Sequence, residues 1–141
     1  MLVMDFKAFK ILLAAEVVLL FIQFWLGVSI SLFVSIPLLS PFNFSSYSGG
    51  LEVLAHIVNG IFVMALAALI LIYSVRLGRI FVSALSTAAL VLVIVASERG
   101  MVFALLGHDS TDSLEMATSF LAAYTIYLAM FYLAERMLPR K

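Results

Sequence analysis

Residues 53–75, which read VLAHIVNGIFVMALAALILIYSV, decide the fold class of this chain. The stretch is a continuous apolar run that contains no Asp, Glu, Lys or Arg. A helix of about 20 residues, rising about 1.5 Å per residue, crosses the ~30 Å hydrocarbon core of a bilayer. Because the run is that long, we expect it to form a transmembrane helix.

Three further apolar runs flank this stretch, at residues 11–36, 80–106 and 114–133. They do not alternate between polar and apolar residues, as the strands of a membrane β-barrel would. Residues typical of turns separate the runs, at 37–50, at Gly78 and at 107–112. We therefore predict an all-α membrane protein, in which residues 1–141 form a single domain of four transmembrane helices in an up-down bundle.

The composition supports a membrane protein and excludes several classes of site. Hydrophobic residues make up 65% of the chain, charged residues make up 11%, and the mean hydropathy is +1.22. A soluble domain is about half apolar and about a quarter charged, so the surplus apolar surface here must face lipid. The formal net charge of zero gives no electrostatic reason to bind nucleic acid. The absence of cysteine excludes disulfides, thiolate metal sites and cysteine nucleophiles.

The basic residues indicate the orientation of the helices. Arg99 alone lies at one end of the predicted spans. The basic residues at the other end are Lys7, Lys10, Arg76, Arg79, Arg136, Arg140 and Lys141. Because cytoplasmic segments carry an excess of Lys and Arg, we predict that both termini are cytoplasmic and that the protein is a multi-pass protein of the plasma membrane.

Polar residues at the start of the second span form the best candidate site. Glu52, His56 and Asn59 are spaced by four and three residues, which stacks them on one helix face. Ionisable groups inside a span cost about 2.5–3.5 kcal/mol each, so they are functional candidates by default. The third span ends at a comparable depth, and we expect one cluster in the outer leaflet. Its expected members are Glu52, His56, Asn59, Glu98, Arg99 and His108.

Two interpretations of this cluster are open. His56 can ligate the iron of heme b or hydrogen-bond a quinone oxygen, with Glu52 and Asn59 beside it and His108 or Met116 as a second ligand. Alternatively, these residues form a hydrogen-bonded set that holds helices in register. A glutamate before an outer-leaflet histidine is similar to one half of a heme A synthase. That family uses Glu-x-x-His and a second histidine on its fourth helix. Here the spacing is Glu52-x-x-x-His56 and no histidine follows His108, so we do not assign the chain to it.

Glu16 is the main candidate for a proton-linked role. In the first span, Glu16, Gln23 and Gly27 share nearly one helix face, and Glu16 lies one to two turns inside the predicted cytoplasmic boundary. A carboxyl group at this depth can exchange protons with a cationic substrate. Glu98, near the outer end of the third span, is a second proton-linked candidate.

The surroundings of Glu16 have two interpretations. The string Ala14-Ala15-Glu16-Val17 resembles the first helix of the small multidrug resistance transporters, which are four-span chains with a first-helix glutamate. The third span lacks the glycine-rich dimerisation pattern of that family. The alternative is that Glu16 extends toward the interface and pairs with a basic residue. The candidate partners are Lys10, Arg76 and Arg79.

The aromatic residues of the first and fourth spans suggest packing surfaces. Phe120, Tyr124, Tyr127 and Phe131 follow one helix face, which we interpret as helix packing, with the wall of a quinone or porphyrin site as the alternative. Trp25 lies within the first span rather than at an interface, which indicates burial against a neighbouring helix or a partner.

The sequence carries no known catalytic motif. It contains no Gly-x-Ser-x-Gly, no phosphate-binding glycine loop, no His-Glu-x-x-His and no paired acidic metal motif. We therefore expect a non-catalytic accessory or structural subunit that lies in the lipid bilayer and packs against a larger membrane complex or against copies of itself. The alternatives are a respiratory subunit that binds heme or quinone near His56, and a small proton-coupled transporter that uses Glu16.

Overall fold

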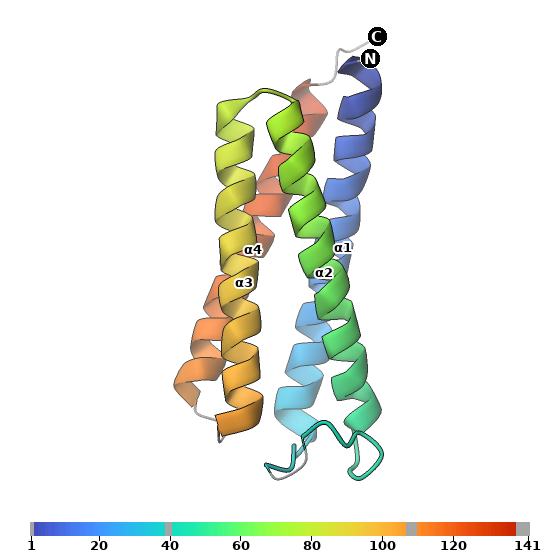
Figure 1. Ribbon diagram of the computed structural model, residues 1–141, viewed down its shortest axis with the longest axis vertical. Helices are drawn as coiled ribbons and strands as arrows, with labels where there is room; N and C mark the ends of the chain where they lie inside the picture. The colour runs from blue at the N-terminus through green and yellow to red at the C-terminus, as the bar shows by residue number, and fades with distance from the viewer. Residues whose placement is uncertain (1, 39–40, 107–109, 138–141) are drawn as a thin grey trace.

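The computed structural model describes residues 2–38, 41–106 and 110–137, and within them the chain forms four helices and no strand (Figure 1). The helices are α1 (Leu2–Phe33), α2 (Gly50–Arg76), α3 (Ile80–Leu106) and α4 (Ser110–Met137). All four are long and apolar enough to cross a membrane. The prediction of an all-α fold with four potential membrane spans is confirmed.

The helices form an up-down bundle in which each one contacts two others (Figure 1). α1 packs against α2 and α4, and α3 packs against the same two helices. The described residues make no contact between α1 and α3, or between α2 and α4, so these pairs lie on the diagonals. The turn between α2 and α3 lies at the same end as the start of α1 and the end of α4. We call this the basic end, because Lys7, Lys10, Arg76 and Arg79 lie there, and we call the opposite end the loop end.

The predicted spans differ from the observed helices mainly at their ends. The third helix has the predicted bounds and continues through Glu98 and Arg99 to Leu106. α1 begins nine residues earlier than predicted, and Phe9 near its start is buried in the bundle. α1 also ends at Phe33 instead of residue 36, since Pro37 disfavours helical backbone in the residue before it.

Two glycines at the start of α2 let the preceding loop fold closely onto the helix. Gly49 caps α2 with a φ of 83°, which favours glycine, and a side chain there would also collide with Val34. A side chain on Gly50 would overlap the backbone of Phe44. Tyr47 closes the loop by donating a hydrogen bond from its hydroxyl to the Pro41 carbonyl at 3.0 Å, and burial raises the pKa of its phenol.

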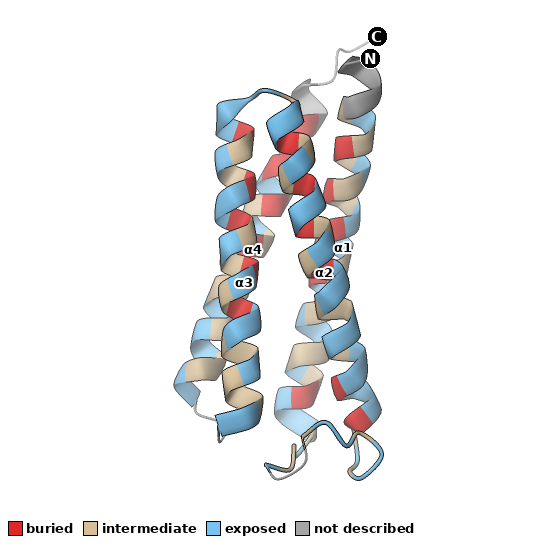
Figure 2. Ribbon diagram, in the orientation of Figure 1, coloured by how far each residue is buried: buried red, intermediate tan, exposed pale blue. Residues whose placement is uncertain are grey.

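The buried residues of the four helices face the interior of the bundle, and exposed residues cover its outside (Figure 2). Apolar side chains occur in both places. Leu13, Leu20 and Ile70 are completely buried, whereas large apolar residues such as Phe33 and Ile80 are more than 80% exposed, at 81% and 89%. Helices that are apolar on all sides are typical of membrane spans. The architecture therefore fits a small multi-pass integral membrane protein whose outer surface contacts lipid.

Candidate functional site

Three polar side chains connect α1 to α2 in the half of the bundle near the loop end. The Nδ2 atom of Asn59 donates to the Leu19 carbonyl at 3.0 Å and to Oε1 of Gln23 at 2.8 Å. The Gln23 Nε2 atom lies 3.1 Å from Nε2 of His56. We call Gln23, His56 and Asn59 the Gln23 network. All three side chains are partly buried, and the hydrogen bonds run from one helix to the other.

The Leu19 carbonyl sets the direction of every hydrogen bond in the network. A carbonyl oxygen only accepts, so the Asn59 atom beside it must be the amide nitrogen. That nitrogen also faces Gln23, which therefore presents its oxygen to Asn59 and its amide N–H to His56. Nε2 of His56 must accept this hydrogen bond, so the neutral ring carries its proton on Nδ1. This Nδ1 atom is buried and has no hydrogen-bond partner among the described residues.

Two glycines allow the helices to approach at this point. A Cβ atom on Gly27 would lie 3.3 Å from Cε1 of His56, and one on Gly60 would lie 3.2 Å from Nε2 of Gln23. Both distances are shorter than ordinary van der Waals contact, so a larger residue would displace the His56 ring or the Gln23 amide. Small residues at helix interfaces are a general device for close packing in membranes.

The other residues of the expected outer cluster separate into two groups. Glu52 is exposed and accepts a hydrogen bond from Ser29 at 3.3 Å, so it does not orient the His56 ring. Arg99 forms ion pairs with Asp112 at 3.3 Å and with Glu115 at 2.8 Å, which connect α3 to α4.

The single outer cluster that we expected is therefore not formed by the described residues. Glu98 is exposed, and among the described residues Arg99 pairs with neither Glu98 nor Glu52, because α4 provides its two acidic partners. His108 lies outside the described residues. The sequence suggested that these side chains share a similar depth, but depth alone does not decide which helix supplies the partner.

The geometry around His56 favours a structural role over a heme ligand. An axial ligand needs a free imidazole lone pair, and the one lone pair of neutral His56 accepts a hydrogen bond from Gln23. Met116 lies at a different interface, where its Sδ atom would be 3.1 Å from a Cβ on Gly100 of α3. His56 and Met116 lie on α2 and α4, which occupy a diagonal of the bundle in the described part of the chain.

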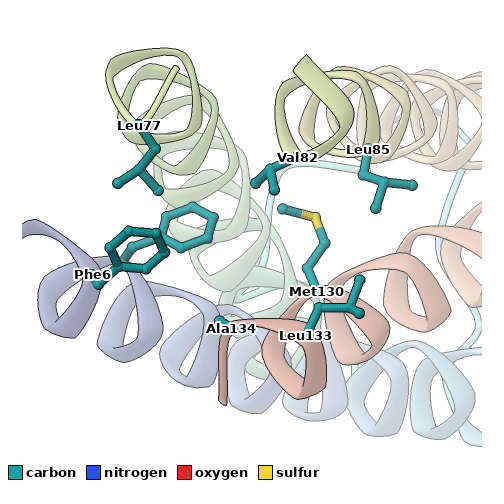
Figure 3. A pocket seen from close by; sticks show the side chains of 8 residues that line it. Phe6, Leu77, Val82, Leu85, Met130, Leu133 and Ala134 are labelled. Carbon is teal, nitrogen blue, oxygen red and sulfur yellow. The ribbon is translucent and has the colours of Figure 1, made fainter. Parts of the chain in front are cut away.

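Two hollows occur in the described part of the chain, and His56 lines neither of them. The first is an apolar cavity of about 10 Å³ between all four helices at the basic end, lined by residues that include Leu77, Val82 and Met130 (Figure 3). The second is an open hollow of about 460 Å³ on the outer face of α4, where Thr125 and Tyr132 contribute to its wall. The described residues contain no group of three or more His, Asp or Glu side chains that could hold a metal ion.

Glu16 lies inside the bundle, and the expectation that it extends toward the interface is wrong. Its side chain has no exposed surface, and neither carboxyl oxygen has a hydrogen-bond partner among the described residues. Tyr127 of α4 is also completely buried, and its hydroxyl group has no partner there either. The ammonium group of Lys10 lies 5.4 Å from the centre of the Phe131 ring, and Phe24 stacks on Phe120 at 6.1 Å, so the antiparallel helices α1 and α4 bring Glu16 and Tyr127 to about the same level.

The sequence did not predict the contact of Gln23 with His56 or the proximity of Glu16 to Tyr127. It placed Gln23 on the face of Glu16 but did not connect it to His56, although Gly27 and Gly60 marked a close helix contact. It interpreted Tyr127 only as part of an aromatic packing stripe. The spacing of residues within one helix does not show which residue of another helix lies at the same level.

Comparisons with protein-family models, with curated proteins and with solved structures find no match to this chain.

Proposed function

We propose that this chain is a non-catalytic accessory or structural subunit of a larger membrane assembly. The observation that carries the proposal is that the hydrogen bonds of the Gln23 network run from α1 to α2. Asn59, Gln23 and His56 use their polar groups to join α1 to α2, instead of presenting them to a cavity. A protein whose membrane-embedded polar groups hold its own helices together has the properties of a scaffold.

Trp25 supports a protein partner on the outer face of α1. Its side chain is 68% exposed, so no helix of this chain covers it as the sequence suggested. It lies eight residues before the end of α1, which is about 12 Å along the helix axis from the loop end. Tryptophan is enriched at membrane interfaces, where its N–H finds a partner, and a protein surface would supply such a partner at this depth.

Purification from the native membrane tests the subunit proposal. We expect the tagged chain, extracted in mild detergent, to bring down a partner or further copies of itself in a fixed ratio, measured by native mass spectrometry. Trp25→Leu should lower the recovery of that partner. Phe62→Leu, which alters a 60% exposed aromatic residue on α2, is the matched control. A stable monomer in every mild detergent would contradict the proposal.

A small proton-coupled transporter is the second candidate function, and the burial of Glu16 favours it. An unpaired ionisable residue in the interior of a membrane bundle is a characteristic feature of proton relays. In proteoliposomes that carry a pH gradient and a panel of organic cations, Glu16→Gln should abolish cation-driven proton movement, and Glu98→Gln should leave it intact. Equal proton movement in wild type and Glu16→Gln would exclude this function.

We also propose that the basic end faces the cytoplasm and that the membrane is the plasma membrane. The concentration of basic residues at this end supports the orientation. Because the chain has no cysteine, single cysteines can be placed without background. An impermeant maleimide should label Ser45→Cys in intact cells but not a cysteine added at the N-terminus. The reverse pattern would contradict the orientation.

An absorption spectrum of the purified protein tests the heme interpretation directly. Because the His56 lone pair is engaged by Gln23, we expect no Soret band, even after incubation with hemin. A Soret band that disappears in His56→Leu would overturn the structural role of this histidine.

A further inference from the structure

The interior of the bundle contains a polar pair that the Gln23 network does not include. Glu16 projects from α1 and Tyr127 from α4, and both side chains are completely buried. The three oxygen atoms of the pair have no hydrogen-bond partner among the described residues. Small buried side chains occupy the neighbouring helices near their midpoints, namely Ala67, Ala89 and Ala123.

The nearest basic residue of α1, Lys10, lies six residues from Glu16, and its ammonium group lies over the Phe131 ring. Within the described residues, α1 packs against α2 and α4. On α4 the ionisable groups that face this region are Tyr127 and, about one turn away, Tyr124. On α2 the nearest along the helix are His56 and Tyr73, each more than two turns from the level of Glu16. No ion pair involving Glu16 occurs in the described part of the chain.

The number of oxygen ligands that this pair offers decides what it can bind. A metal ion such as Na⁺ or Ca²⁺ needs more oxygen ligands than one carboxyl and one hydroxyl supply. An unpaired carboxylate in an apolar interior costs far more free energy than the neutral acid. A proton needs only the carboxyl oxygen itself, and it removes the charge. The pair is therefore suited to a proton.

We propose that Glu16 and Tyr127 form a buried proton-binding site between α1 and α4. The Glu16 carboxylate takes up one proton to become the neutral acid and releases it again, and no other bond changes. When the carboxylate forms, the Tyr127 hydroxyl donates a hydrogen bond to it. Tyr127 is thus a positioning residue that stabilises the deprotonated state.

The cavity at the basic end lies near this site along α4. Met130 lines the cavity (Figure 3). It lies three residues from Tyr127, which is about 4.5 Å along the axis of α4. The cavity holds about one water-sized volume, but an apolar lining gives a water molecule no hydrogen bonds. The site is therefore closed in this conformation, and proton exchange requires the helices to open at least locally.

This inference supplies the site that the second candidate function needs, but proton binding would also hold in a subunit that transports nothing. Dicyclohexylcarbodiimide tests it, because this apolar reagent reacts with neutral carboxylic acids inside membranes. The carboxyl proton moves to one carbodiimide nitrogen, the carboxyl oxygen adds to the central carbon, and rearrangement leaves a stable N-acylurea. Peptide mass spectrometry of the protein in lipid nanodiscs locates the product.

We expect labelling at Glu16 that falls as the pH is raised, and no labelling at the exposed Glu52 and Glu98. Glu16→Gln should remove the label, and Glu16→Asp should retain it. Tyr127→Phe should move the pH of half-maximal labelling upward by about one to two pH units, because the carboxylate loses its donor. The variants are compared only after gel filtration and circular dichroism show the wild-type fold.

The outcomes of this experiment distinguish the proposed proton-binding site from the proposed transporter function. Labelling confined to other residues, or independent of pH, would overturn the proton site. An unchanged pH profile in Tyr127→Phe would remove Tyr127 from it. Labelled Glu16 without any cation-driven proton movement would support the site and contradict only the transporter.

Discussion

The hydrogen bond between Asn59 and Gln23 is expected to stabilise the contact of α1 with α2 by a measurable amount. Interhelical hydrogen bonds in membrane proteins contribute about 0.6 kcal/mol on average and up to about 1.7 kcal/mol. Asn59 makes two such bonds and Gln23 also makes two, and one bond is common to both residues. Each single substitution to leucine should therefore lower the free energy of unfolding by about 1–3 kcal/mol, including the cost of the partner left unpaired.

The double variant isolates the contribution of the Asn59–Gln23 hydrogen bond from the contributions of the other bonds of these two residues. Adding the two single losses counts the Asn59–Gln23 bond twice, so Asn59→Leu combined with Gln23→Leu should lose less than their sum. The expected coupling is about 0.6–1.7 kcal/mol. The assay is reversible unfolding in mixed micelles, followed by far-ultraviolet circular dichroism as the fraction of denaturing detergent is increased.

A matched control comes from the outer face of α4. Thr125 is exposed and donates a hydrogen bond to the Leu121 carbonyl of its own helix, at 2.8 Å. Thr125→Val should change the unfolding free energy by less than about 0.5 kcal/mol. A coupling of zero within error between Asn59 and Gln23 would refute the reasoning, because it would mean that the network does not join the two helices.

Three further substitutions test other features by the same unfolding measurement. Glu16→Leu should stabilise the protein by about 1–3 kcal/mol, since it removes a buried group with unpaired oxygens, and a loss of stability would show that Glu16 has partners in the folded state. Arg99→Gln should cost less than about 1 kcal/mol, because the Arg99 side chain is 37% exposed, and a larger, salt-independent loss would contradict this. Gly49→Ala should cost more than Gly78→Ala, since both have positive φ but only Gly49 would also collide with Val34, and equal costs would count against the observed loop packing.

The sequence by itself determined the helices. The length and apolar character of a run are properties of consecutive residues, and they decide whether that run can cross a bilayer. For this reason α3 matched its predicted bounds and the other helices differed only at their ends, where Phe9 packs into the bundle and Pro37 ends the helical backbone. The distribution of basic residues in the sequence likewise predicted one basic end, and the structure brings the described ones together there.

The tertiary structure alone decided which polar side chains meet. Gln23 rather than Glu52 contacts His56, Arg99 pairs with α4 rather than with Glu98, and Glu16 is buried at the level of Tyr127 instead of lying at the interface. The physical reason is that these helices are apolar on nearly all sides, so their residue patterns do not specify which face turns inward. Rotation of each helix about its axis, and the choice of its neighbours, are set by side-chain packing between helices. Glycine and alanine positions far apart in the chain determine that packing, and it appears only when all four helices are assembled.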